Sequence, residues 1–134
     1  MVYICVDNSA GENLALFTRG PGGSHIMRMY DVRRQNQTAI WTTELEPFPP
    51  LSNGEVNRAR FSPDMIYLAA ARSDNITHIY DSRMIGRGVL HAFEHAGPSR
   101  SFPGCESFGV MEVQWVETPW LGLVSGGTDG ESQE

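Results

Sequence analysis

Residues 61–81 read FSPDMIYLAAARSDNITHIYD, and they hold two short runs rich in β-branched, aromatic and small apolar residues. Ser62-Pro63-Asp64 comes before the first run, and its proline presets φ for a tight turn. Ser73-Asp74-Asn75 lies between the two runs and supplies further turn residues. Helical periodicity is weak, so the pattern predicts two antiparallel strands joined by turns.

The same type of run recurs along the 134 residues, with Gly, Pro, Asn and Asp between successive runs. Such punctuation is typical of a fold built from short strands. Strands are predicted at Val2–Asp7, Asn13–Thr18, His25–Val32, Thr38–Leu45, Val56–Phe61, Ile66–Ala71, Ile76–Asp81, Val89–His95, Val110–Val116 and Gly122–Ser125. The predicted fold class is therefore all-β.

Two segments of the chain repeat each other. HIMRMYDVR at 25–33 aligns with NITHIYDSR at 75–83, and both contain an Ile four residues before a Tyr-Asp-x-Arg motif. Their tyrosines, Tyr30 and Tyr80, are 50 residues apart. A second alignment joins Asp74 to Asp129 at an offset of 55 residues. Periods of this size indicate repeated units that stack on one another.

The motif order in the middle of the chain resembles one repeat of the Trp-Asp-repeat β-propeller family, fungal members included. The matching segments are Phe61–Asp64, Tyr67–Ala71, Ser73–Asn75 and Ile79–Asp81, with Tyr80 in the place usually held by Trp. Residues 115–116 and 123–130 resemble the first two strands of a following repeat, and 13–46 resemble a more divergent one.

The resemblance implies an incomplete β-propeller made of antiparallel four-stranded blades. One partial domain would span residues 1–134, with a blade at 2–46, a blade at 55–95 and a half blade at 110–130. Blades of this kind usually repeat every ~40–45 residues. The longer period here fits two extended connections rich in Pro, Ser and Gly, at Pro47–Gly54 and Ala96–Gly109.

The family closes each blade with a buried polar network of His, Ser or Thr, Asp and Trp. The resemblance assigns these roles to Ser73, Asp74, Tyr80, Asp81, His95, Ser125 and Asp129. The Gly-His position before the middle blade reads Asn53-Gly54, so its histidine is missing and the network is incomplete. A buried polar group left without its hydrogen-bond partner lowers the free energy of unfolding by about 1–3 kcal/mol.

The last repeat is cut short. Tyr80 lies six residues after Asp74, whereas the position six residues after Asp129 falls beyond the chain. The polar tail at 130–134 is expected to lack the third strand of the blade. Propellers need about four to eight blades to close. Three explanations fit, in order of preference. The chain is a fragment of a longer protein, it is an aberrant gene product, or it completes a ring by self-association through its open blade edges.

Charge and composition disfavour several classes of function. The net charge is −6, lysine is absent, and residues 101–134 carry six acids and no base, so nucleic acid is not an expected partner. No apolar run reaches the ~20 residues that cross a bilayer, and the N-terminus lacks a signal peptide, so no membrane partner and a cytoplasmic or nuclear location are expected. Cys5 and Cys105 form no zinc or disulfide pattern.

No catalytic, cofactor-binding or metal-binding residues are assigned. His91 and His95 point to the same face of one predicted strand, but a metal site would need a third ligand. No Gly-x-Ser-x-Gly motif is present, and without lysine there is no phosphate-loop or Schiff-base lysine. The chain is therefore predicted to be a non-catalytic scaffold that binds other proteins. A hydrolase or metal enzyme with scattered parts is the rival from the enzyme class.

Two features suggest where a partner would bind. The Tyr-Asp-x-Arg motifs resemble the docking box of substrate receptors for cullin-RING ubiquitin ligases, which would assign partner binding to Arg33 and Arg83, with Asp31. The alternative is that each Asp-x-Arg pair only bonds locally. Apolar loop residues are the second feature, at 48–51, 102–103 and 120–121. Of these, Trp120 is expected to pack between blades.

Overall fold

The computed structural model describes residues 2–6, 13–19, 24–31, 33, 38–48, 54–95, 109–117, 120–127 and 132–133. Apart from one 3₁₀ turn at Ile85–Arg87, the regular elements in these residues are strands. They are β1 (Val2–Val6), β2 (Asn13–Arg19), β3 (His25–Asp31), β4 (Trp41–Glu44), β5 (Val56–Phe61), β6 (Tyr67–Arg72), β7 (Ile76–Asp81), β8 (His91–Glu94), β9 (Val110–Val116), β10 (Gly122–Gly127) and β11 (Ser132–Gln133). The predicted all-β fold class is confirmed.

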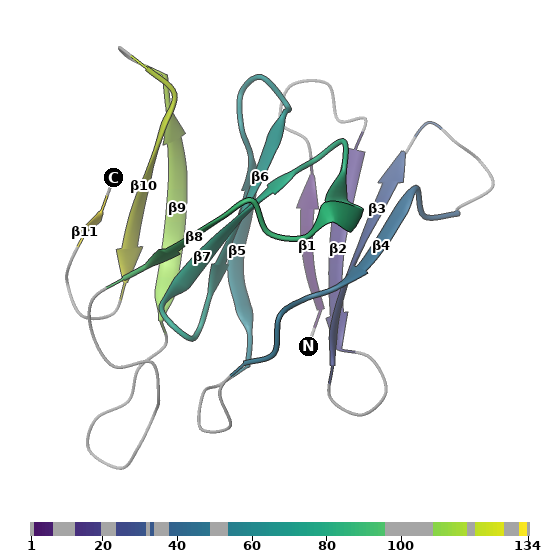
Figure 1. Cartoon of the computed structure of the whole chain (residues 1–134), viewed down its shortest axis with the longest axis horizontal. Coiled ribbons are helices and arrows are strands. Elements are labelled where there is room, and N and C mark those ends of the chain that lie inside the picture. The colour runs from purple at the N-terminus through teal and green to yellow at the C-terminus, as the bar shows by residue number, and fades with distance from the viewer. Residues whose placement is uncertain are drawn as a thin grey trace.

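The strands form three antiparallel sheets in chain order, which lie side by side as successive layers (Figure 1). The first sheet has the order β1-β2-β3-β4, the second β5-β6-β7-β8 and the third β11-β10-β9. Each strand pairs with its neighbour in sequence, so short turns suffice to connect them within a sheet. This is the meander expected of a propeller blade.

The second sheet is covered on both faces. Leu68 and Ala70 of β6 pack in a core shared with the first sheet, whereas Ala69 and Ala71 pack in a core shared with the third. All four side chains are buried. Because successive side chains of a strand point to opposite faces, a strand between two layers must be apolar at every position. The run Leu68–Ala71 satisfies this requirement, and its small side chains let the neighbouring sheets approach.

The first sheet is covered fully on one face only. In β2 and β3, buried residues alternate with half-exposed ones. The buried set faces the second sheet and includes Ala15, Phe17, Met27 and Met29. The strand pattern therefore reports the position of each sheet in the stack: alternation marks an outer layer, and continuous burial marks an inner one.

The second and third sheets share a detail of strand register. The pairing of β5 with β6 shifts between Val56 and Arg58, and that of β9 with β10 shifts between Val110 and Glu112. Each first strand thus carries a β-bulge after its first residue, which kinks the strand at the same point of the repeat. Phe61 faces Leu68 in the second sheet, and Trp115 faces Leu123 in the third. The two pairs are therefore equivalent, with Phe61 matching Trp115 and Leu68 matching Leu123.

The third sheet contains a strand that the sequence did not predict. Ser132 and Gln133 form β11 and pair with Gly126 and Ser125 of β10. The polar tail at 130–134, expected to lack the β-branched third strand, thus contributes two paired residues to the sheet. Pairing uses main-chain N–H and C=O groups, so a polar segment without β-branched residues can still extend a sheet.

The two-sided burial of β6 leads to a stability prediction. Ala69→Leu adds three carbons to the closed core between the second and third sheets, and we expect it to lower the free energy of unfolding by about 1–3 kcal/mol. Ala92→Leu is the matched control, because Ala92 lies on the exposed strand β8 and the same change there should cost less than about 0.5 kcal/mol. Urea unfolding measures both. Equal losses for the two variants would contradict two-sided packing.

Candidate functional site

Arg72, at the end of β6, is the centre of a buried polar network between the first and second sheets. Its guanidinium makes two hydrogen bonds with the Asp74 carboxylate, from Nε to Oδ1 at 3.1 Å and from Nη2 to Oδ2 at 2.7 Å. It also donates to the carbonyl oxygens of Glu46 at 2.8 Å and Pro47 at 3.2 Å. The Phe48 ring lies 3.9 Å from the guanidinium carbon. The network ties the β6–β7 turn to the connection that leaves the first sheet.

His78 and Tyr80 of β7 lie beside this network. His78 Nδ1 lies 3.4 Å from Arg72 Nη1, and its Nε2 lies 3.7 Å from a carboxylate oxygen of Glu46. Burial and the neighbouring Arg72 charge lower the pKa of His78, so the neutral ring accepts a hydrogen bond from Arg72. Burial raises the pKa of Tyr80 to about 12, and its ring packs in the apolar core shared with the first sheet.

Two further contacts fasten the start of the second sheet. The Ser73 hydroxyl accepts a hydrogen bond from the Glu55 amide at 2.9 Å, and the Ser73 amide donates to the Glu55 carbonyl at 2.9 Å. His25 Nε2 lies 2.6 Å from the Gly54 carbonyl oxygen, to which Arg19 also donates at 3.3 Å. The Gly-His position of the repeat reads Asn53-Gly54 and so has no histidine of its own. In the structure, His25 from β3 of the first sheet lies against Gly54.

The structure brings together some of the residues assigned to the blade network. Ser73, Asp74 and Tyr80 are buried around the β6–β7 hairpin, and Arg72 is the partner that the sequence reasoning missed. Asp81 lies apart from Arg72 and Asp74, with its carboxylate in a surface pair with Arg83. His95 and Ser125 are buried, and the His95 amide donates to the Asn75 carbonyl at 2.7 Å. Asp129 lies outside the described residues.

The two Asp-x-Arg pairs have the same geometry. The Asp31 carboxylate accepts from Arg33 at its amide (3.0 Å), Nε (3.2 Å) and Nη2 (3.2 Å). The Asp81 carboxylate accepts from the same three atoms of Arg83 at 2.9, 3.2 and 3.2 Å. Each arginine is thus paired locally, as the alternative interpretation expected, yet the side chains of Arg33 and Arg83 remain 65% and 66% exposed.

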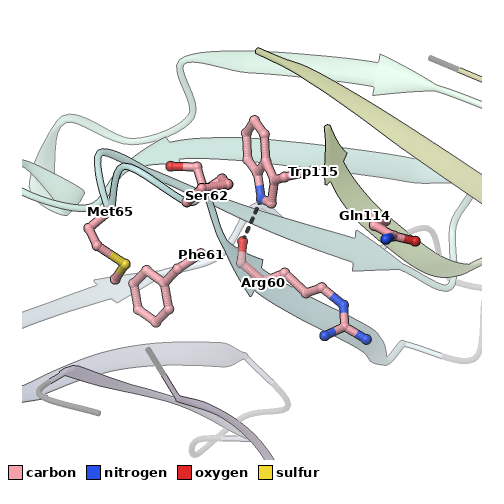
Figure 2. A pocket seen from close by; sticks show the side chains of 7 residues that line it. Arg60, Phe61, Ser62, Met65, Gln114 and Trp115 are labelled. Carbon is pink, nitrogen blue, oxygen red and sulfur yellow. Dashed lines mark hydrogen bonds between the residues drawn. The ribbon is translucent and has the colours of Figure 1, made fainter. Parts of the chain in front are cut away.

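The interface between the second and third sheets is held by polar contacts from β5. Asn57 Nδ2 donates to the Val110 carbonyl at 2.9 Å, and Arg60 Nε donates to the Val113 carbonyl at 3.1 Å. In return the Trp115 indole N–H donates to the Arg60 carbonyl at 3.0 Å (Figure 2). The Glu112 carboxylate of β9 also pairs with Arg58 and Arg60 of β5, so side chains from both strands fix the spacing of the two sheets.

An open pocket of about 500 Å³ lies at this interface, beside the β5–β6 turn (Figure 2). Its lining residues are Arg60, Phe61, Ser62, Pro63, Met65, Gln114 and Trp115. The Ser62 hydroxyl donates to Asp64 at 2.5 Å and accepts from the Tyr67 amide at 3.0 Å, so it holds the turn together. Among the described residues, no group of three His, Cys, Asp or Glu side chains could hold a metal ion.

A second depression of about 350 Å³ lies at the outer side of the same interface, and we call it the outer groove. It is lined by Tyr67, Ile79, His91, Phe93, Trp115, Leu121, Gly122 and Leu123. Phe93 is 49% exposed at its edge. Next to Leu121 in the chain, Trp120 is 81% exposed, so it does not pack between the second and third sheets.

The other apolar loop residues differ from Trp120. Phe48 is half-buried and packs against the core of the first two sheets and against Arg72. Residues 49–51 and 102–103 lie outside the described residues. Of the helical segments that the structure describes, none is long and apolar enough to cross a bilayer.

The Arg72 network leads to a second stability prediction. Arg72→Met leaves the Asp74 carboxylate buried without its counter-charge, so we expect the free energy of unfolding to fall by about 3–5 kcal/mol. Arg83→Met is the matched control. Arg83 also pairs with an aspartate two residues away, but it is exposed, so its loss should leave the unfolding midpoint nearly unchanged. Urea unfolding followed by tryptophan fluorescence distinguishes the two variants, and similar midpoints would refute a structural role for Arg72.

No known protein family model matches the chain, and no curated protein matches its sequence. Solved structures do match its fold. The Dos1 propeller superposes with a TM-score of 0.67 at 18% identity, over 96% of this chain and 28% of that one. A chain in the crystal structure of the mitotic checkpoint complex superposes with a TM-score of 0.59 at 20% identity, over 93% of this chain and 32% of that one.

This chain therefore spans about a third or less of the length of either structural neighbour. The matches agree with the three stacked antiparallel sheets. The fold is that of adjoining blades of a β-propeller, the architecture that the sequence resemblance to Trp-Asp repeats implied.

Proposed function

We propose that this chain is a non-catalytic scaffold that binds other proteins through the outer groove and the aromatic residues at its rim. The observation that carries this proposal is the exposure of Trp120 (81%) and Phe93 (49%) beside a groove lined by apolar and aromatic side chains. Large aromatic side chains on a rigid framework are favourable anchors for a partner, because they bury much surface at little cost in side-chain entropy.

The polar chemistry of the described residues supports the same proposal. Arg72, Asp74 and His78 are buried and engaged with one another, and the Ser62 hydroxyl is used in a turn. These groups stabilise the stack and do not converge on an open pocket as an acid, base and nucleophile would. One structural neighbour is a chain of the mitotic checkpoint complex, so in that protein the fold serves in an assembly.

The proposal predicts which substitutions abolish binding. Affinity capture with the wild-type chain should recover a set of proteins that Trp120→Ala and Phe93→Ala each deplete several-fold, because truncating an interface aromatic typically costs more than about 1 kcal/mol. Trp41→Ala is the matched control, since Trp41 is also exposed but lies on the first sheet. Quantitative mass spectrometry compares the four samples. If the wild-type chain and the three variants recovered the same proteins in equal amounts, the outer groove would not be the binding surface.

A second candidate function is that of a substrate receptor for a cullin-RING ubiquitin ligase. The equal geometry of the Asp31–Arg33 and Asp81–Arg83 pairs favours it, because two arginines are presented to solvent in the same pose one repeat apart. In the same capture experiment, the double variant Arg33→Ala, Arg83→Ala would then lose a ligase adaptor while keeping the proteins that depend on Trp120. If the double variant lost no adaptor subunit, this second candidate would be abandoned.

A further inference from the structure

Arg72 uses all five of its N–H donors inside the junction between the first and second sheets. Its Nε and Nη2 donate to the two carboxylate oxygens of Asp74, and Nη2 also donates to the Pro47 carbonyl. Its Nη1 donates to the Glu46 carbonyl at 2.8 Å and to His78 Nδ1 at 3.4 Å. Because a guanidinium has five N–H groups and no acceptor, the unprotonated Nδ1 of His78 is the fifth acceptor that the buried arginine needs.

A proton on Nδ1 of His78 would remove this acceptor. The imidazolium carries an N–H at both ring nitrogens, so Nδ1 would then direct a hydrogen at Arg72 Nη1. Both side chains are only 2% exposed, so water can neither replace the lost hydrogen bond nor screen the two positive charges. One donor of Arg72 would be left without an acceptor, and two cations would face each other at 3.4 Å.

The other groups around His78 offset this repulsion only in part. A carboxylate oxygen of Glu46 lies 3.7 Å from Nε2, but the Glu46 side chain is 67% exposed, so water weakens its attraction. Both oxygens of Asp74 are already bonded to Arg72. The residues opposite His78 in β6 and β8 are alanines, and Tyr80, whose pKa burial raises to about 12, stays neutral. The pKa of His78 is accordingly lowered, first by burial and then by the Arg72 charge.

His25 is the second histidine of this junction, and it acts on Arg72 less directly. The Phe48 ring lies 4.7 Å from the His25 ring and 3.9 Å from the guanidinium carbon of Arg72, so an uncharged side chain contacts both. His25 Nε2 bonds to a main-chain carbonyl, and burial lowers the pKa of His25, with Arg19 as a neighbouring charge. Of the two histidines, His78 is the one whose protonation removes a hydrogen bond from Arg72.

We propose that His78 makes the junction between the first and second sheets acid-sensitive, because a proton on its Nδ1 breaks the Arg72 network and releases the connection at 46–48 from the second sheet. Arg72 holds this connection through the carbonyls of Glu46 and Pro47 and through the ring of Phe48. The junction lies between other sheets than the outer groove does, so this inference stands apart from the proposed function.

The sign of the pH dependence follows from the two states of the chain. In the unfolded chain His78 takes up a proton at its ordinary pKa of 6.5, whereas in the folded chain its pKa is lower. The unfolded chain therefore binds more protons as the solution becomes acidic. The stabilisation that neutral His78 provides is complete above this pH, and it is lost as the pH falls below 6.5 toward the pKa of the folded state.

Urea unfolding at a series of pH values tests the inference. As the pH falls from about 7.5 to about 5.5, His78 should raise the unfolding equilibrium constant by several-fold, with about tenfold as the limit for one group of this unfolded pKa. In His78→Asn the side-chain oxygen takes the place of Nδ1 as the acceptor and does not titrate, so this part of the rise should disappear. His91→Asn is the matched control, because His91 is exposed on β8, and it should keep the wild-type pH dependence.

Amide hydrogen exchange locates the opening. Protection factors corrected for intrinsic exchange should fall between about pH 7.5 and about pH 5.5 in residues 41–48 of the wild-type chain, and they should not fall in His78→Asn. The Leu45 amide, which donates to the His25 carbonyl at 2.8 Å, is a reporter within this segment. Strands β9 and β10 belong to the third sheet and serve as the internal reference.

Glu46→Gln supplies a readout that a merely structural role of His78 would not move. Loss of this carboxylate removes an attraction for the imidazolium, so the pKa of His78, measured by NMR at the ring Cε1 proton, should fall further below that of the wild-type chain. Glu44→Gln makes the same charge change at an exposed position on β4 and should leave the pKa of His78 unchanged.

Three results would each overturn the inference. They are an equal pH dependence of unfolding in His78→Asn and the wild-type chain, unchanged protection of residues 41–48 in acid, and a pKa of His78 that Glu46→Gln raises or does not alter. Because Glu46 is exposed, the NMR titration tests the inference even where His78→Asn lowers the overall stability.

Discussion

Burial of both faces of β6 is the constraint on which the rest of the structure depends. A strand in the middle of a stack cannot alternate apolar with polar residues, because neither of its faces meets water. Leu68–Ala71 meets this requirement with small side chains, and the sheets on either side can then approach closely. The first and third sheets each complete one of the two cores, so no sheet of the stack buries its apolar surface alone.

The polar contacts follow from this arrangement of layers. Once the sheets are in contact, the turn at the end of β6 comes close to the connection from the first sheet, and Arg72 fills the space between them. Asp74 neutralises its charge, which a guanidinium removed from water requires. At the other interface Asn57 and Arg60 bond to main-chain carbonyls of β9. The polar groups therefore fix how the sheets are positioned, while the apolar cores supply the driving force for stacking.

Much of the fold could be predicted from the sequence, since the period of the apolar residues and the turn residues are local signals. The bounds of β5, β7 and β9 match the prediction. β4 is shorter than predicted at Thr38–Leu45, because ladder pairing with β3 begins only at Trp41.

The site was harder to predict. Arg72 donates to main-chain carbonyls 26 and 25 residues away in sequence. Every residue has a carbonyl, so no residue type marks these partners in the sequence. Nor could composition show that Trp120 faces solvent, since that depends on which strands lie beside its hairpin.

Amide hydrogen exchange tests the central claim most directly, because it reports the protection of each strand without any substitution. If the second sheet is the inner layer, the amides of β6 and β7 exchange most slowly and at a common rate, while those of the exposed strand β8 exchange faster. Should the amides of 67–81 exchange as fast as those of 91–94, the second sheet would not be enclosed between two others, and the stacked-blade account would be contradicted.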